Sequence, residues 1–405
     1  MKLSLRRAKL PLREPFTISR GTRSFQHSVY VCLEHDGLLG LGEVSENHFY
    51  GQTFDSISQS LKKTSSALNS YIDNPPQEVW STMARLVEGD LFALSALDTA
   101  AYDLQGKRKG VATWKRFNLE WNRHVKSSYT IGIDSIDVMR KKLTDNANWA
   151  IFKIKLGTEN DIEIVSELRQ CTDGMLRVDA NCAWNVDQAI SNSIALSDLG
   201  VEFIEQPLPT NASWKDKNRL YNESALPIIA DEDCQKESDV VTCLGSYHGI
   251  NIKVNKCGGL TPAIRMLNDA KRLGLKTMVG CMIESSIGIS GAAQLAPLLD
   301  YADLDGAALL KDEPASGILI ENGIINLTDA PGNGCSIDFE RLANFRRQKT
   351  NLSYRLTPMT LKHNDLKLKP SYNSRPRINA RSVPKETEIC RERWLPKTSN
   401  RFDTR

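Results

Sequence analysis

Long apolar runs are absent from this sequence of 405 residues, and their absence excludes one class of protein at the outset. No stretch approaches the roughly 18 consecutive apolar residues that a membrane-spanning helix needs. The first residues, Met1 to Arg7, also lack the apolar stretch of a secretion signal. We therefore expect a protein without a membrane partner that works in the cytoplasm.

The nine cysteines lack any regular spacing. They are spread from Cys32 to Cys390, and none forms a Cys-x-x-Cys pair. Zinc sites and disulfide frameworks both depend on close or regular cysteine spacing. The sequence therefore predicts neither, which fits a reducing compartment.

The net charge of +3 hides an uneven distribution along the chain. Residues 341–405 contain seventeen Lys and Arg against five Asp and Glu, whereas residues 1–340 have nine more acidic than basic residues. Five prolines interrupt this basic tail, which lacks a helical or strand period, so we expect it to be disordered. No nucleic-acid recognition fold accompanies the tail, so we do not expect nucleic acid as a partner.

Up to residue 112 the pattern is that of a mixed α+β unit. Alternating residues at 27–34 and 38–43 predict a strand pair that turns at Asp36-Gly37. Helical periodicity follows at 53–72 and again at 93–107.

Residues 113–340 change to short strand-like runs separated by amphipathic stretches. Helical patterns at 161–169, 186–199 and 261–273 alternate with these runs, which predicts a parallel sheet with crossover helices, as in a (β/α) barrel. The eight candidate strands are 129–133, 151–156, 176–178, 202–204, 228–230, 250–254, 277–279 and one near Tyr301.

Ionisable residues close five successive strand-like runs. They are Lys155, Asp179, Glu205, Asp231 and Lys253, at intervals of 22 to 26 residues. The carboxyl ends of barrel strands all meet at one face, so these side chains should converge on one cavity. A single Asp at a strand end is more often a helix cap, but a series of five is hard to explain in that way.

Three of these residues, Asp179, Glu205 and Asp231, are carboxylates without a His or Cys partner. Such an all-oxygen set suits Mg²⁺ or Mn²⁺ rather than zinc. A bound ion would stabilise the negative charge that forms when the carbon beside a carboxylate loses its proton. Asn181 either orients this site or caps a loop.

The lysines have a spacing suited to proton transfer. Lys153 and Lys155 are two residues apart and share one face of a strand, where the charge of Lys153 should favour the neutral amine of Lys155. Lys253 comes four strands later, half the circumference of an eight-stranded barrel, so it should face Lys155 across the cavity. One lysine can then remove a proton while the other returns one to the opposite side, which suits racemisation or epimerisation.

Two further carboxylates, Asp303 and Asp305, lie at the end of the last strand. Both lie on one face and could bind a substrate ammonium group. A helix cap next to a surface acid is the alternative interpretation.

Together these motifs resemble the muconate-lactonizing subgroup of the enolase superfamily. The resemblance covers residues 1–340 and lies in Lys153-Ile154-Lys155, Asp179-Ala180-Asn181, Glu205-Gln206-Pro207, Ala230-Asp231-Glu232 and Asn251-Ile252-Lys253. Within the subgroup, Gly280 to Glu284 and Asp303-Leu304-Asp305 are similar to the dipeptide epimerases, including those acting on L-Ala-D/L-Glu.

The resemblance implies a modified (β/α)7β barrel with an N-terminal α+β capping domain. It further implies that a metal-stabilised enolate forms at the α-carbon of the dipeptide's C-terminal residue, with the amino terminus held by Asp303 and Asp305. Loops 16–23 and 45–52 would set specificity, and Arg20 or Arg23 would pair with an acidic substrate side chain. The implied roles of the remaining residues are Mg²⁺ ligands for Asp179, Glu205 and Asp231, acid/base pair for Lys155 and Lys253, and electrostatic helper for Lys153.

Other functions stay open from the sequence alone. A cycloisomerase or an o-succinylbenzoate synthase-like lyase would use the same lysines without needing Asp303 and Asp305. A non-catalytic barrel that recruits partners through its basic tail belongs to a different class. Barrels of this kind often assemble as homo-oligomers, although the sequence carries no interface signal. Asp233, where the subgroup often has Ser, should add negative charge near the metal site.

Overall fold

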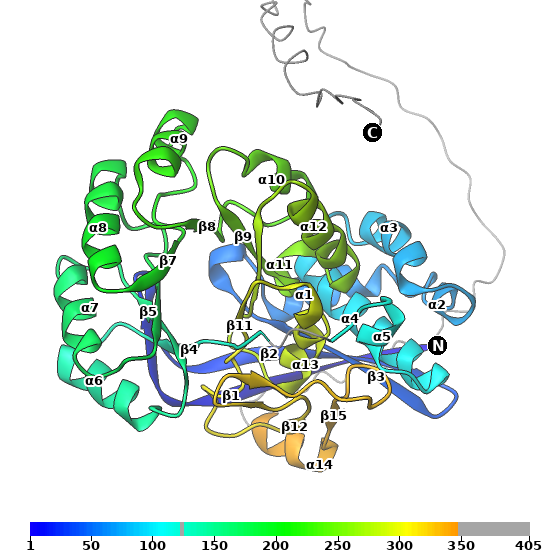
Figure 1. Cartoon of the computed structure of the whole chain (residues 1–405). Coiled ribbons are helices and arrows are strands. Elements are labelled where there is room, and N and C mark those ends of the chain that lie inside the picture. The colour runs from blue at the N-terminus through cyan, green and yellow to red at the C-terminus, as the bar shows by residue number, and fades with distance from the viewer. Residues whose placement is uncertain (122–124, 347–405) are drawn as a thin grey trace, which may run out of the picture. The chain divides into compact units, whose positions relative to one another are not determined.

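The computed structural model describes residues 1–121 and 125–346. The chain begins with an antiparallel sheet in the order β1-β2-β3, formed by Lys2–Ile18, Gly21–His35 and Leu38–Ser45 (Figure 1). β2 and β3 contain the predicted strand pair. Its turn is Asp36-Gly37, with φ of 50° and 75°, and a two-residue hairpin turn needs positive φ at both central positions.

The longest helix of this first unit, α4 (Leu91–Lys109), contains the predicted helix 93–107 and packs on β3. Gly42 allows the close approach, because a Cβ there would overlap the carbonyl group of Ala96. The other helical segments of the unit are η1 (His48–Tyr50), α1 (Phe54–Lys62), α2 (Ser70–Asp73), α3 (Pro76–Leu86) and α5 (Thr113–Arg116).

The single helix predicted over 53–72 was wrong in its middle, where α1 ends at Lys62 and α2 begins only at Ser70. The hydroxyl groups of Thr64 and Ser65 donate to the carbonyl groups of Leu61 and Lys62, both at 2.7 Å. Such local bonds compete with helix continuation, which apolar periodicity alone does not reveal.

All eight predicted barrel strands are present, with ends within two residues of those expected, in one parallel sheet ordered β4 to β11. A parallel bridge between Ser127 and Ala302 links the two edge strands. The strands are β4 (Tyr129–Ile131), β5 (Ile151–Lys155), β6 (Met175–Asp179), β7 (Val201–Glu205), β8 (Ile228–Ala230), β9 (Gly249–Lys253), β10 (Lys276–Gly280) and β11 (Tyr301–Asp303).

Seven longer helices alternate with the eight strands, so the architecture is (β/α)7β, as the resemblance implied. They lie outside the sheet, as α6 to α9 illustrate in Figure 1. The helices are α6 (Ile136–Asp145), α7 (Asp161–Arg169), α8 (Val186–Asp198), α9 (Trp214–Glu223), α10 (Glu237–Thr242), α12 (Leu260–Arg272) and α13 (Ser286–Ala293), with the short α11 (Val254–Cys257) and η2 (Ala296–Leu298) between them.

After β11 the chain returns to the N-terminal sheet. Leu342 is buried in one apolar cluster with Leu10 of β1 and Tyr30 of β2, so the ordered fold continues past residue 340. The elements of this return are β12 (Ala315–Ser316), β13 (Ile320–Glu321), β14 (Ile324–Ile325), β15 (Ser336–Ile337), α14 (Phe339–Leu342) and η3 (Ala343–Arg346).

Two expectations about organisation stay predictions. The boundary between capping unit and barrel, placed after residue 112, falls just before α5. The basic tail, for which we expect disorder, lies almost entirely in residues 347–405, outside the described part of the chain. Within the described residues, no helix is both long and apolar enough to cross a membrane.

Candidate active site

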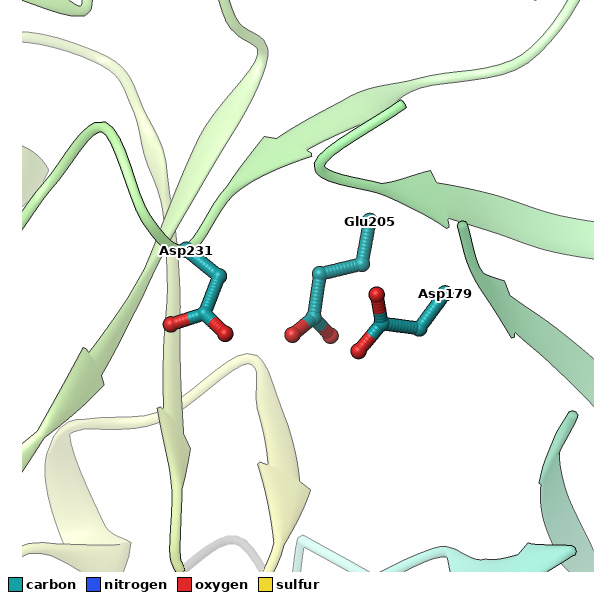
Figure 2. A group of neighbouring side chains, drawn as sticks. All are labelled: Asp179, Glu205 and Asp231. Atoms are coloured by element: carbon teal, nitrogen blue, oxygen red, sulfur yellow. The ribbon is translucent and has the colours of Figure 1, made fainter. Parts of the chain in front are cut away.

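Three carboxylates meet at the carboxyl end of the barrel strands. Asp179 closes β6, Glu205 closes β7 and Asp231 follows β8 by one residue (Figure 2). One ligand oxygen from each lies within 4.8 Å of the others, and the three residues are at most 1% exposed. The strand register explains the grouping, because Asp179 pairs with Lys155 on one side and with Glu205 on the other.

Two lysines flank this triad on the β5 side. The ammonium group of Lys155 donates to Asp179 Oδ2 at 2.6 Å. Lys153, two residues earlier and 1% exposed, lies 2.8 Å from both Glu205 Oε2 and Asp303 Oδ2 and 3.2 Å from Asp179 Oδ2. Lys153 therefore joins the triad to the end of the last strand.

Two further lysines lie on the β9 side. Lys253 Nζ donates to Asp231 Oδ2 at 2.7 Å, so the acid/base candidates hold the two outer carboxylates of the triad. Lys256 Nζ donates to the main-chain oxygen and Oδ1 of the same Asp231, at 2.6 and 2.5 Å. Lys256 is out of phase with the residues that point inward from β9, so its position in the sequence favours a structural role.

Burial and neighbouring charges shift the pKa values of the three carboxylates in different directions. Burial raises the pKa of Asp179, but Lys155 and Lys153 outweigh burial and hold it below its usual value. Burial also raises the pKa of Asp231, and Lys253 and Lys256 reverse that effect. Glu205 differs, since burial and the charge of Asp179 raise its pKa to about 7. Its Oε1 accepts from the amide of Asn251 at 2.9 Å.

The two aspartates of the last strand are close to this cluster but differ from each other. Asp303 accepts from Ser128 Oγ at 2.7 Å and from Lys153, and these contacts hold its pKa below the usual value despite burial. Asp305 accepts from the main-chain N–H of Thr130 at 2.6 Å. Burial and the charge of Asp303 raise the pKa of Asp305 to about 7.

The tip of the β1–β2 hairpin lies against the barrel near the triad. Thr17 O accepts from the N–H of Ile133 at 2.9 Å, and Arg20 donates to Glu232 at 2.9 Å. The guanidinium of Arg20 also lies 4.7 Å from the ring centre of Phe49, in the second predicted specificity loop. Arg23 donates at 3.0 Å to the neutral side chain of Gln26.

Comparison with known proteins follows the same division of the chain. Residues 1–116 match the mandelate racemase / muconate lactonizing enzyme N-terminal domain, and residues 138–342 match the enolase C-terminal domain-like family. The chain belongs to the mandelate racemase / muconate lactonizing enzyme family.

Relatives within this family include named dipeptide epimerases. An L-Ala-D/L-amino acid epimerase of Flavobacterium johnsoniae is 44% identical over 337 residues, which are 83% of this chain and all of the relative. A dipeptide epimerase from Cytophaga hutchinsonii, solved with Mg and D-Ala-L-Val, aligns with a TM-score of 0.79 at 25% identity, over 85% of this chain and 97% of that one. A dipeptide epimerase from Enterococcus faecalis, solved with Mg and L-Leu-L-Tyr, gives 0.76 at 30% identity, over 83% and 99%.

One departure from the subgroup's sequence pattern has a local explanation. Asp233 was expected to add negative charge near the triad, but it pairs with Lys217 at 2.7 Å and accepts from the hydroxyl of Tyr247. Its charge is therefore neutralised on the spot.

Asn181, the other uncertain residue, lies beside the triad. Its main-chain N–H donates to Asp179 Oδ1 at 2.9 Å, and its buried Oδ1 has no hydrogen-bond partner among residues 1–121 and 125–346. The main-chain contact orients Asp179, while the free side-chain oxygen is available to a bound molecule.

The sequence suggested no contact for Asn251 and only a structural role for Lys256, and the structure adds both residues to the cluster. Asn251 begins the motif Asn251-Ile252-Lys253. Because it lies two residues before Lys253, its amide should point inward, and this could have suggested a contact with the triad. A Cβ on Gly280 would lie 2.8 Å from the Asn251 amide, so the glycine of the next strand makes room for it. Lys256 carried no sequence signal, because the direction of its side chain depends on the short turn of α11.

Proposed function

We propose that this chain is a Mg²⁺-dependent dipeptide epimerase that inverts the α-carbon of the C-terminal residue of its substrate. The observation that carries the proposal is the placement of Lys155 and Lys253. They end β5 and β9, and three strands of the barrel lie between these two strands on either side. Each lysine donates to an outer carboxylate of the same triad. Two proton carriers on opposite walls are what inversion at carbon requires.

The triad fits a hard divalent cation. Asp179, Glu205 and Asp231 offer oxygen ligands only and are buried, and their ligand atoms are close enough for one ion to reach all three. Mg²⁺ held there would supply positive charge for the substrate carboxylate and for the charge that develops as the α-proton leaves.

The protein's own part of the reaction is proton transfer between two amines. The Nζ of one lysine, neutral at that moment, removes the α-proton from one face of the carbon. The ammonium of the other lysine then returns a proton to the opposite face. In one direction of epimerisation Lys155 removes the proton and Lys253 returns one, and in the other direction the two lysines exchange these parts. Neither lysine is therefore permanently the acid or the base.

Asp303 and Asp305 would bind the ammonium terminus of the dipeptide. In this structure the ammonium of Lys153 already contacts Asp303 at 2.8 Å, which demonstrates that the carboxylate can accept such a group. Asp305 accepts from Thr130, and a carboxylate offers about four lone-pair sites, so it retains capacity to accept from a substrate.

Of the two candidate arginines, Arg23 is the better partner for an acidic substrate side chain. Moving Arg20 to the substrate would leave Glu232, whose side chain is 2% exposed, as an unpaired buried carboxylate. Breaking a buried pair in this way costs about 3–5 kcal/mol. Arg23 has no carboxylate within ion-pair distance among the described residues.

Substrate class, cellular location and assembly extend this proposal. The eight cysteines of the described residues are all free thiols, which supports a reducing location such as the cytoplasm. The expected homo-oligomer stays a prediction.

The test is proton exchange in D2O. Purified protein and Mg²⁺ are incubated with L-Ala-L-Glu and a pool of other L-Ala dipeptides, and NMR follows loss of the α-proton signal and formation of the epimer. Lys155→Ala and Lys253→Ala should each reduce epimerisation by about 10²- to 10⁴-fold. Lys276→Ala is the control, because this lysine begins β10 at the other end of the barrel and is largely exposed.

A metal-loaded protein that exchanges no α-proton across the pool would contradict the proposal. Asp303→Asn combined with Asp305→Asn tests the dipeptide assignment, with the surface variant Asp312→Asn as its control. Turnover that is indifferent to the double substitution would exclude a bound amino terminus and point to a cycloisomerase or lyase.

A further inference from the structure

The two sides of the active site have the same plan, although the sequence revealed only one of them. On the β5 side, Asp179 is shared by Lys155 and Lys153. On the β9 side, Asp231 is shared by Lys253 and Lys256. Each acid/base lysine thus has a second lysine that contacts the same carboxylate.

Lys256 is among the most buried charged residues of the protein. Its side chain is 0% exposed, and its ammonium group contacts both Asp231 Oδ1 and the main-chain oxygen of Asp231. Lys253 uses the other carboxylate oxygen, Oδ2. Asp231 is therefore fixed at two atoms by one lysine and remains accessible to the second through a different atom.

The capping unit holds Lys256 in this position. The residue lies in α11, one turn that ends at Gly258 in the left-handed conformation, with φ of 98°. Trp80 of α3 donates to the carbonyl of Gly258 at 2.8 Å, and a Cβ at that glycine would come within 3.2 Å of the Trp80 ring. The position of Lys256 thus depends on a contact that crosses from barrel to cap.

We propose that Lys256 is a positioning residue for the Lys253 half of the reaction, the counterpart of Lys153 on the other wall. Lys256 holds Asp231 by Oδ1 and the main-chain oxygen, so that Oδ2 keeps a fixed direction. When Lys253 leaves Oδ2 to exchange a proton with substrate, Lys256 still neutralises Asp231. The inference rests on the proposed function for its catalytic consequence, but not for its effect on Asp231.

A positioning role for Lys256 and a purely structural role predict different effects of replacing this residue. Replacing Lys256 by an apolar side chain leaves Asp231 Oδ1 without its donor, so the carboxylate should reorient, although the main-chain oxygen still accepts from the N–H of Cys234 at 3.2 Å. Because Lys253 is bonded to that carboxylate at 2.7 Å, it should move as well, whereas Lys155 is bonded to Asp179. The damage should therefore be one-sided, while general destabilisation would affect both lysines alike.

The experiment uses the full chain with Lys256→Met and, as a second variant in case the first folds poorly, Lys256→Gln, which keeps two N–H donors. The matched control is Lys107→Met. Lys107 is a half-buried lysine in the cap that likewise donates to a carboxylate, Asp103, and to a main-chain oxygen, that of Leu39, at 2.6 and 2.9 Å. Thermal unfolding establishes that each variant is folded.

The first readout is Mg²⁺ binding by calorimetry without substrate. We expect Lys256→Met to weaken binding about 10-fold or more, the usual effect of losing a group that orients a metal ligand. Lys107→Met should bind like the wild type. Unchanged affinity in the folded Lys256 variants would overturn the inference, whatever the substrate of the enzyme.

The second readout is α-proton exchange at saturating Mg²⁺, measured from each epimer of the dipeptide separately. Lys256→Met should lose about 10-fold more exchange from the epimer that Lys253→Ala fails to exchange than from the other epimer. Equal losses from both epimers would also overturn the inference. A third outcome is that the wild type exchanges no dipeptide while Lys256→Met still binds Mg²⁺ more weakly than the wild type. That combination would leave the role of Lys256 on Asp231 intact and reject the proposed function.

Discussion

On four of the barrel strands, two layers of inward-facing residues only two positions apart differ in chemistry. The upper layer contains Asp179, Glu205 and Asp231, with Asp303 beside them. Two residues earlier on the same strands lie Arg177, Phe203, Ile229 and Tyr301, and three of these four fill the lumen together with Met278. Residues two apart in a strand point to the same face, so both layers face the same lumen.

The difference between these layers illustrates a division of labour within one barrel. In the lower layer, the guanidinium of Arg177 lies against two rings that contact each other, 5.2 Å from the centre of Phe203 and 5.0 Å from that of Tyr301. Phe203, Ile229 and Met278 are fully buried under the charged residues. Buried packing stabilises the fold, whereas residues at the carboxyl ends of the strands are free to perform chemistry.

The largest effect should come from the upper layer. Lys155→Ala should reduce epimerisation by about 10²- to 10⁴-fold, the usual contribution of a general acid or base. Because Asp179 keeps Lys153 at 3.2 Å, the free energy of unfolding should change less than for a substitution in the lower layer. Kinetics and denaturant unfolding of the same preparation measure both. A variant that loses stability in proportion to activity would remove the distinction between the layers.

Phe203→Ala should show the reverse pattern. Its ring is fully buried, and truncating a buried Phe lowers the free energy of unfolding by about 3–5 kcal/mol. The folded fraction should still bind Mg²⁺, as calorimetry at low temperature can determine. Loss of Mg²⁺ binding without loss of stability would mean that the two layers act as one.

A buried carboxyl group outside the lumen, which has hydroxyl and main-chain donors but no lysine partner within the described part of the chain, provides a comparison with the upper layer. Asp98 of α4 accepts from the N–H and hydroxyl of Thr261, at 2.8 and 2.9 Å, and burial raises its pKa to about 7. A folded pKa above the unfolded value means that its contribution to stability is full at low pH and is lost as pH rises through 7. Stability of the wild type should fall relative to Asp98→Asn between about pH 4 and pH 7. Parallel pH profiles of the two proteins would contradict the assignment.

The smallest effect should come from the loop near the upper layer. Arg23→Gln should raise the KM for L-Ala-L-Glu by about 10-fold, the value of one charge-assisted hydrogen bond. The KM for L-Ala-L-Gln should not change. An equal effect on both substrates would show that Arg23 supports the loop rather than a substrate carboxylate.

The strand order, the barrel class and the residues that meet in the candidate site could be predicted from local patterns in the sequence. Strand-like runs closed by Lys155, Asp179, Glu205, Asp231 and Lys253 are local patterns, and parallel strands bring their carboxyl ends together in any fold of this class. Strand β1 was missed, because Pro11 and Pro15 interrupt its alternation and the register shifts between Pro11 and Phe16. Its pairing with β2 decides that segment, and pairing is not a local property.

Which charges meet could not be predicted from the sequence, because it depends on contacts between distant parts of the chain. Arg20 is paired with Glu232, more than 200 residues away, so its availability to a substrate could not be deduced from its place in a loop. Lys256 reaches Asp231 because a single helical turn, held by Trp80 of the cap, points it inward against the strand period. Periodicity predicts the direction of side chains within a strand or helix, but at the turn between them the direction is set by packing from elsewhere in the chain.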